Sequence, residues 1–238
     1  MKGSADRRLA AVADIVRAVR ADLRRLPQLS TDTIRGVRRQ YSAALVNASP
    51  STVVDVADRL MAGGSAAERL VRTELLIARR DVIRRVKSVD VEKWAADLDD
   101  WGSIDMYGVT VAGIAWRDGC VHDRQVMRWA ASPNRWRRRL ALVATVPLNS
   151  RARGGEGDTA RTLRVCAALV DDRDDMVVKA LSWALRELSK RDPESVAGFL
   201  RVHESRLASR VRCEVRTKLD TGRKVAPRRA RSTRRLSA

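Results

Sequence analysis

Cysteine and histidine are scarce in this sequence, and the few that occur are not spaced for binding a metal. The three cysteines, Cys120, Cys166 and Cys213, are odd in number and far apart, which excludes a disulfide framework and a cysteine-based zinc site. Each lies among Val, Ala or Arg in a helical context, so we expect three small core residues. His122 and His203 are the only histidines, and neither has a partner at metal-ligand spacing. A His-based catalytic triad is therefore excluded, and we expect no metal and no other cofactor.

Acidic residues are few relative to basic ones. The chain has 29 Asp and Glu against 48 Lys and Arg, a formal net charge of +19 over 238 residues. Such an excess does not stabilise a fold, but it attracts a polyanion, nucleic acid first and an anionic membrane second. No apolar run approaches the roughly 20 residues of a membrane span, and MKGSADRRLA lacks the apolar core of a signal peptide. We therefore expect a cytoplasmic, nucleoid-associated protein.

Strand patterns are absent, and apolar residues recur at intervals of three and four, which predicts an all-α fold. Capping residues predict helix starts at Ser30-Thr31-Asp32, Ser49-Pro50, Ser132-Pro133 and Asp192-Pro193. Breaks are predicted at residues 62–65, around Gly119, at 149–157 and near Arg191. About a dozen short helices with few aromatics favour a HEAT-like helical solenoid. A compact helical bundle is the structural alternative.

The end of the chain differs in composition from the rest. After Leu219 the sequence carries seven Lys or Arg and one acid, Asp220, with no apolar periodicity. We therefore predict a single domain over residues 1–219 and a basic, disordered tail over residues 220–238 that adds non-specific attraction to phosphate.

Two helices carry basic side chains on a face that also bears, or adjoins, a tryptophan. In residues 175–190 the apolar stripe is Val177, Leu181, Ala184 and Leu188. A second stripe lies about 200° away and contains Lys179, Trp183, Arg186 and Lys190. In residues 132–146 the apolar stripe is Trp136, Leu140 and Val143, with Arg135, Arg138 and Arg139 on the adjacent face. We expect Trp136 in the core, Trp183 off it, and the arginines either solvated or aligned along phosphates.

The segment WGSIDMYGVTVAGIAW places an indole and a carboxylate, Trp101 and Asp105, four residues apart on one side of a helix. The core stripe of this helix is Ile104, Tyr107, Val111 and Ile114. Gly108 and Ala112 accompany Trp101 and Asp105, and we expect these small residues to leave room for a partner's backbone. The spacing alone is a weak motif, which fits a solvated acid beside a tryptophan as well as a catalytic pair. Three other tryptophans fit apolar stripes and are expected in the core: Trp94, Trp116 and Trp129.

One carboxylate between aromatic faces suits chemistry at a sugar carbon. The cationic transition state of glycosidic cleavage is stabilised by π-faces and a nearby negative charge. Ordinary glycosidases need a second carboxylate to protonate the leaving group. A purine alkylated at N7 or N3 is already positively charged and leaves without a proton, so one carboxylate is sufficient.

The segments DDWGSIDMYG, NRWRRRLAL and VVKALSWALRELSKRDPESV, followed by RVRCEVRTKL, closely resemble the DNA alkylation repair glycosylases of AlkD type. The resemblance covers most of the chain and is strongest from about residue 95 to 219. It implies a right-handed solenoid of HEAT-like repeats that wraps duplex DNA in a basic concave face. Trp101 and Trp183 would face the deoxyribose of the damaged nucleotide and Asp105 would be the catalytic carboxylate. By the same resemblance, Arg139 and Arg186 would hold the backbone beside the lesion.

The resemblance further implies a monomeric, monofunctional glycosylase that releases N3- or N7-alkylated purines and leaves an abasic site for base excision repair. Such enzymes accept bulky adducts because the base enters no deep pocket, and some relatives give self-resistance to producers of DNA-alkylating natural products. The alternative is a non-catalytic binder of damaged or branched DNA, from which the retained Asp105 distinguishes this chain. A HEAT-type protein scaffold is a third possibility, which the net charge disfavours. The 148–158 loop and the tail depart from the family pattern, and we expect the loop to be flexible.

Overall fold

The computed structural model describes residues 2–61 and 64–224, and every regular element in these ranges is helical. The prediction of an all-α fold is confirmed. The first part of the chain forms α1 (Lys2–Arg25), α2 (Thr31–Ala44), α3 (Pro50–Met61), α4 (Ala66–Ala78), α5 (Arg80–Ile83) and α6 (Ser88–Ala95). The middle forms α7 (Trp101–Tyr107), the π-helical η1 (Gly108–Ala112), α8 (Gly113–Arg117), α9 (Asp123–Ala130), α10 (Arg135–Val143) and α11 (Val146–Asn149). The last part forms the 3-10 helix η2 (Arg151–Arg153), α12 (Thr159–Ala168), α13 (Asp175–Leu188), α14 (Pro193–Val202) and α15 (Ser209–Thr221).

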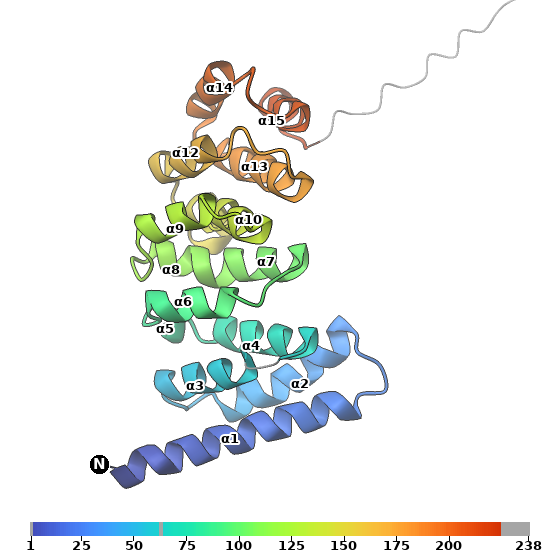
Figure 1. Cartoon of the computed structure of the whole chain (residues 1–238), viewed down its shortest axis with the longest axis vertical. Helices are drawn as coiled ribbons and strands as arrows, with labels where there is room; N and C mark the ends of the chain where they lie inside the picture. The colour runs from blue at the N-terminus through green and yellow to red at the C-terminus, as the bar shows by residue number, and fades with distance from the viewer. Residues whose placement is uncertain (1, 62–63, 225–238) are drawn as a thin grey trace, which may run out of the picture.

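The helices are stacked in layers along one long axis, from α1 at one end to α14 and α15 at the other (Figure 1). Within this stack, α4, α7, α10, α13 and α15 contact one another in succession, and α9 contacts α12. Layers that contact only their neighbours favour the predicted solenoid over a compact bundle. The right-handed superhelix and the HEAT-like repeats stay predictions. None of the helices in the described part of the chain is long and apolar enough to cross a membrane.

Most of the predicted helix starts are observed. Ser30 and Asp192 cap α2 and α14, and α3 begins at Pro50. The start predicted at Ser132-Pro133 is wrong, because the side chain of Asn134 accepts from the Trp136 amide at 2.8 Å and α10 begins at Arg135. Ser132 instead forms a turn, in which its hydroxyl accepts from the Asn134 amide at 3.2 Å.

Three tryptophans bind the layers together from inside the core. Trp94, Trp116 and Trp129 are buried, as predicted. Each indole N–H donates to a carboxylate on another helix or at its start, at 2.6 to 2.8 Å: Asp58, Asp123 and Glu92, respectively. A buried indole needs such an acceptor, because an unpaired N–H in the core would cost about 1–3 kcal/mol.

The prediction of three core cysteines is correct only for Cys166. Cys120 is half-buried and Cys213 is exposed. Cys213 lies on the terminal helix α15, where Val211 and Val215 take the buried positions and no further described layer covers the other face. Among the described residues there is no group of three or more His, Cys, Asp or Glu that could hold a metal ion.

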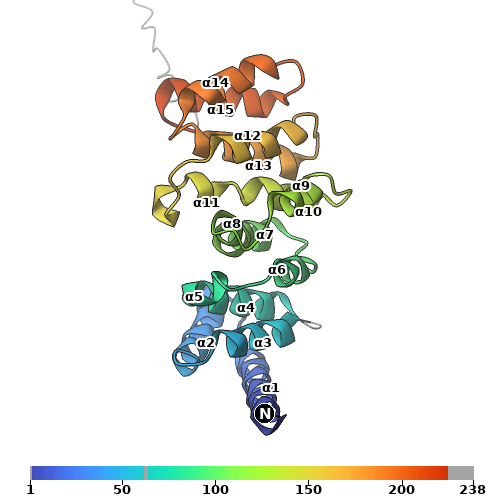
Figure 2. The ribbon, with the colours of Figure 1, turned by 90° about the vertical axis from the view of Figure 1, so that its left-hand side faces the viewer.

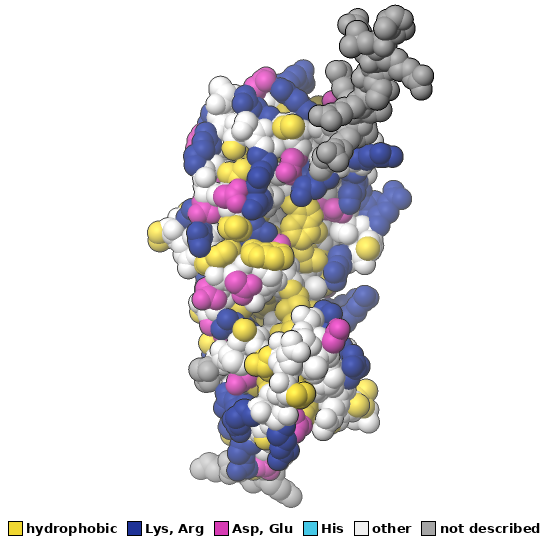
Figure 3. Space-filling model, turned by 90° about the vertical axis from the view of Figure 1, so that its right-hand side faces the viewer, with side chains coloured by type: hydrophobic (Ala, Val, Ile, Leu, Met, Phe, Trp, Pro, Cys, Tyr) yellow, Lys and Arg dark blue, Asp and Glu magenta, His cyan; other side chains and the backbone are white. Residues whose placement is uncertain are grey.

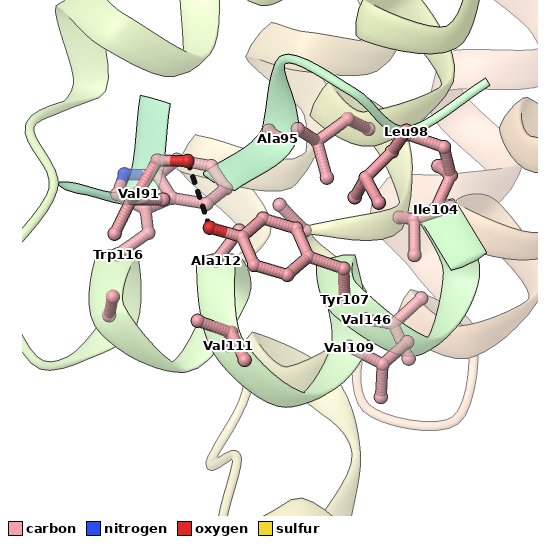
Figure 4. Packing of buried hydrophobic residues seen from close by; sticks show 14 of the residues in the cluster. Val91, Ala95, Leu98, Ile104, Tyr107, Val109, Val111, Ala112, Trp116 and Val146 are labelled. Carbon is pink, nitrogen blue, oxygen red and sulfur yellow. Dashed lines mark hydrogen bonds between the residues drawn. The ribbon is translucent and has the colours of Figure 1, made fainter. Parts of the chain in front are cut away.

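Helix α7, which carries Trp101 and Asp105, is fixed at both ends. At its start, Asp100 caps the helix by accepting from the Ser103 amide at 2.9 Å. The loop before α7 is tied to α4, where the fully buried Arg72 donates to both carboxylate oxygens of the loop residue Asp97 at 3.2 Å. At the end of α7, the buried Tyr107 hydroxyl donates to the Val91 carbonyl at 2.8 Å (Figure 4).

The small residues of η1 lie inside the protein, and Gly108 faces another helix of the same chain. A Cβ atom on Gly108 would lie 2.7 Å from the Cγ1 atom of Val143 on α10, and Gly108 and Ala112 are both buried. The expectation that these residues leave room for an external partner is therefore wrong. They allow α7 and α10 to approach closely, which brings Asp105 beside Arg139.

Candidate active site and nucleic-acid interface

Helices α7, α10, α13 and α15 border one open hollow of about 500 Å³. Its lining comprises Trp101, Asp105, Arg139, Lys179, Trp183, Arg186, Arg210, Glu214 and Lys224. The structure thus brings together the carboxylate and both tryptophans singled out in the sequence, although Trp101 and Trp183 are 82 residues apart. Figure 3 shows the side of the stack on which α7 begins, where hydrophobic side chains run down the middle and Lys and Arg gather beside them.

Asp105 is held by Arg139 in a two-point ion pair. The Nε atom of Arg139 donates to Oδ1 of Asp105 at 2.8 Å, and its Nη2 atom donates to Oδ2 at 2.7 Å. The third nitrogen, Nη1, donates to the Met176 carbonyl on α13. The Arg139 side chain is 6% exposed and that of Asp105 is 19% exposed. Arg139 therefore does not face out with Arg135 and Arg138 as expected, because the pair with Asp105 turns it inward.

The environment of Asp105 has opposing effects on its pKa. Burial raises the pKa, and the hydrogen bonds and charge of Arg139 lower it, with a net result above the ordinary value for Asp. Since an unperturbed Asp titrates near pH 4, the carboxylate loses its charge at a higher pH than a surface Asp does.

The two tryptophans of the hollow are anchored to different degrees. Trp101 begins α7 and is 61% exposed, so its ring is available to a ligand. Trp183 is half-buried: it lines the hollow beside Lys179 and Arg186, as its helix face predicts, but it also packs against the core. Trp136, expected in the core, packs against it but is only half-buried, with the Arg135 guanidinium 4.7 Å from its ring centre. It lies in the first turn of α10, where neighbouring helices cover only part of the indole.

Arg186 is held by a network that reaches α15. Its Nε atom donates to the Ser182 hydroxyl at 3.2 Å, and that hydroxyl donates to Glu214 at 2.7 Å. The Glu214 carboxylate also lies 3.6 Å from Nη2 of Arg186. Burial lowers the pKa of Arg186, which still remains a cation at neutral pH because a guanidinium group is not deprotonated in proteins. Glu214 is therefore suited to holding Arg186 in place.

Sequence reasoning missed the contribution of α15 to the hollow. Arg210 and Glu214 lie four residues apart on this helix, and Arg210 pairs with Asp175 at 2.9 Å. Their spacing places them on one helix face, a signal that the segment RVRCEVRTKL contained. Lys224 lies just beyond α15, which ends at Thr221, two residues later than the predicted domain boundary at Leu219.

Only half of the predicted DNA-binding cations line the hollow. Arg139, Lys179 and Arg186 do so, and Lys179 also pairs with Asp175 at 2.6 Å. The other three lie outside the hollow, each against an acid: Arg135 at 3.7 Å from Asp174, Arg138 at 2.6 Å from Asp172, and Lys190 at 2.6 Å from Glu187. Their predicted role on phosphate stays a prediction.

The described part of the predicted tail is short. Residues 225–238 lie outside the described residues, so the disorder expected there stays a prediction. The last described residue, Lys224, lines the hollow.

Comparison with known families and proteins adds one finding. The model of the DNA alkylation repair enzyme family matches residues 7–219, which is most of the chain. No curated protein and no solved structure matches.

Proposed function

The chain belongs to the DNA alkylation repair enzyme family, and from this premise we propose that it is a monofunctional DNA glycosylase. It hydrolyses the N-glycosidic bond of N3- or N7-alkylated purines in duplex DNA and leaves an abasic site. The observation that carries this proposal is the placement of Asp105, held by Arg139 in an open hollow that Trp101 and Trp183 also line.

The proposed reaction uses the charge of the damaged base. The bond between C1′ and the purine nitrogen breaks, and its electron pair passes to the ring and neutralises the positive charge of the alkylated base. The sugar becomes an oxocarbenium-like cation, which the Asp105 carboxylate and the indole faces stabilise. Water then adds to C1′, and its proton leaves to Asp105 or to solvent.

The open shape of the hollow supports a wide range of adducts. Because four helices border it and Trp101 projects from its edge, an alkylated base need not enter an enclosed pocket. We therefore propose that bulky N7 and N3 adducts are substrates as well as methyl adducts, which is compatible with a role in self-resistance to a DNA-alkylating natural product.

A second candidate function is favoured by the same ion pair. Both carboxylate oxygens of Asp105 are engaged by Arg139, as in a purely structural pair. The chain would then bind damaged or branched DNA without cutting the glycosidic bond.

Base release separates the two functions. The protein is incubated with duplexes that carry N7-methylguanine, N3-methyladenine or one bulky N7-guanine adduct, and free base and abasic sites are measured. Release from any of these duplexes, with none from the undamaged duplex, supports the glycosylase. Tight binding to the damaged duplexes without release from any of them contradicts it and favours the binder.

Replacing Glu214 by Gln should weaken binding to a damaged duplex by about three- to tenfold. The change removes the carboxylate that Ser182 and Arg186 contact, and a hydrogen bond to a charged group contributes about 1.5–3 kcal/mol, less where water has access. Equilibrium binding measures the effect, with the exposed Glu194→Gln on α14 as a control that changes the charge equally. Equal affinities for the two variants would show that Glu214 does not position Arg186 for DNA.

Removing residues 225–238 should weaken binding to undamaged DNA and flatten its salt dependence. The segment carries five Arg and no acid, and each phosphate neutralised contributes about −0.9 to the slope of log affinity against log salt. Cutting after Lys224 retains α15 and Gly222 at its end. Binding to an unmodified duplex is measured over a salt series, and single-turnover base release at saturating DNA should change little. An unchanged slope would show that the tail does not touch DNA.

A further inference from the structure

A second concentration of arginines lies outside the hollow, at two adjoining depressions beside α2, α4, α5 and α8. The depressions share Ile77, Thr110 and Arg153 in their linings. Together they are lined by six arginines, Arg35, Arg38, Arg80, Arg84, Arg117 and Arg153, against two acids, Glu74 and Asp118. We call these eight residues the arginine surface. In Figure 2, α2, α5 and the segment that follows α11 lie along one edge of the stack, although they are far apart in sequence.

The acids of this surface are each shared by two arginines. Glu74, nearly buried, accepts from Arg35 at 2.6 Å and from Arg38 at 3.1 Å. Asp118 pairs with Arg117 at 2.8 Å and lies 3.9 Å from Arg84. One carboxylate neutralises only one of two guanidinium groups, so each trio keeps a net positive charge.

Two of the arginines have no acid of their own. Arg80 and Arg153 are exposed, and neither side chain has an ion-pair partner among the side chains that the structure describes, those of residues 8–61 and 64–224. The floor between the arginines is apolar and contains Ile77, Ile83 and Ile114. Cations over an apolar floor attract an anion more strongly than cations surrounded by water, because the low-dielectric wall focuses their field.

The loop that supplies Arg153 is fixed in place. The buried Asn149 donates to the Thr145 carbonyl at 3.0 Å and accepts from the Asp158 amide at 3.0 Å. Arg191 donates to the carbonyls of Asn149 and Gly155. The expectation of a flexible 148–158 loop is therefore wrong.

Glycine is required where this loop turns. Gly154 and Gly157 have φ angles of 77° and 106°, and a Cβ atom on Gly155 would lie 2.4 Å from the Pro147 carbonyl oxygen. A loop fixed by buried polar contacts holds the backbone of the exposed Arg151 and Arg153 in place. A fixed position suits the binding of a stiff polyanion whose charges repeat at a regular spacing.

We propose that the arginine surface binds the phosphodiester backbone of duplex DNA at a distance from the hollow. Asp105 and Arg117 are twelve residues apart along the continuous α7, η1 and α8, which spans about 18 Å at 1.5 Å per residue. This separation along the axis is short enough for one duplex to span, and the proposal requires that it contacts both places. The arginine surface adds affinity and orients the duplex, while the hollow acts on the damaged nucleotide. This inference extends the proposed function, since it requires DNA as the partner but does not require base excision.

The test compares two triple variants with the same loss of charge. The first is Arg80→Gln, Arg84→Gln and Arg153→Gln, which removes exposed cations of the arginine surface and retains the pairs around Glu74. The control is Arg124→Gln, Arg128→Gln and Arg201→Gln, three exposed arginines on α9 and α14 that line neither the depressions nor the hollow. Binding of each protein to an undamaged duplex is measured over a salt series. Thermal melts check that both variants fold.

The salt slope of the surface variant should fall by about two to three units, because each phosphate that is no longer neutralised removes about 0.9 from the slope. The control should fall by less than one unit. Equal slopes for the two variants would overturn the proposal, because the effect would then follow net charge alone. A surface variant that binds DNA like the wild type but no longer sediments with phosphatidylserine vesicles would also overturn it, in favour of a membrane partner. If the wild type releases no base but the slopes differ as expected, the proposed reaction fails and this inference stands.

Discussion

Replacing Asp105 by Asn should reduce single-turnover base release by about 10²- to 10³-fold, while the affinity for a damaged duplex changes little. The variant keeps the size and one acceptor of the side chain but removes the charge that faces the cationic sugar. Removal of one preorganised electrostatic interaction with a transition state commonly costs about this much in rate. The measurement is release of N7-methylguanine at saturating enzyme.

The structure changes what this variant should do to stability. The helix pattern places Asp105 on a polar face, which predicts that the fold does not depend on it. Asp105 is in fact the partner of the buried Arg139, and an Arg with a neutral partner leaves a charge poorly compensated in the core. We therefore expect some loss of thermal stability, below the roughly 3–5 kcal/mol of a fully broken buried pair, because Asn can still accept one hydrogen bond.

The chain contains a matched control for this loss. Asp97 is held by the buried Arg72 through the same two-point interaction, and neither residue lines the hollow. Asp97→Asn should therefore destabilise the protein about as much as Asp105→Asn does, without loss of base release from the folded protein. If the loss of base release in both variants simply followed the decrease in their melting temperatures, Asp105 would be a structural residue. The assignment of a catalytic carboxylate would then fail.

The sequence predicted the parts of the fold that depend on one helix at a time. Helical periodicity indicated the all-α fold, and the apolar stripes placed Trp94, Trp116 and Trp129 in the core. The predictions from helix faces were wrong where a neighbouring helix decides the environment. They placed the Arg139 side chain on the outer face of its helix, because periodicity does not show that Asp105 on α7 lies opposite it. They also assigned Gly108 to an external partner, although Val143 of α10 fills that space.

The residues of the hollow could be predicted from the sequence only where they depend on a single helix face or on the family resemblance. Trp101, Asp105 and Trp183 follow from helix faces and from a family resemblance, and they do line one hollow. Glu214 acts on Arg186 across two helices, and the arginine surface combines α2, α5 and a loop near residue 153. Contacts between segments so far apart in sequence require the stacking of the layers, which periodicity does not define.

Replacing Arg139 by Gln should lower base release at neutral pH by about 10²-fold and move the acidic limb of its pH profile to higher pH. In the wild type the pKa of Asp105 is above its ordinary value because burial outweighs the effect of Arg139. Removing the guanidinium leaves burial unopposed, so the pKa rises further and a smaller fraction of Asp105 is ionised at any given pH. Since the proposed reaction needs the ionised form, activity should fall as the pH falls through this raised pKa.

The Arg139→Lys variant distinguishes positioning of Asp105 from direct contact with phosphate. Lysine retains the positive charge, so a residue that only neutralises a phosphate should keep most of its binding and its salt slope. It cannot reproduce the two parallel bonds to Asp105, so base release should stay low and the acidic limb should lie between those of the wild type and Arg139→Gln. If Arg139 instead binds the backbone beside the lesion, Arg139→Gln should reduce the salt slope by about one unit and keep the wild-type pH profile. Single-turnover rates over a pH series, together with binding over a salt series, therefore decide whether this arginine acts on the carboxylate or on the DNA.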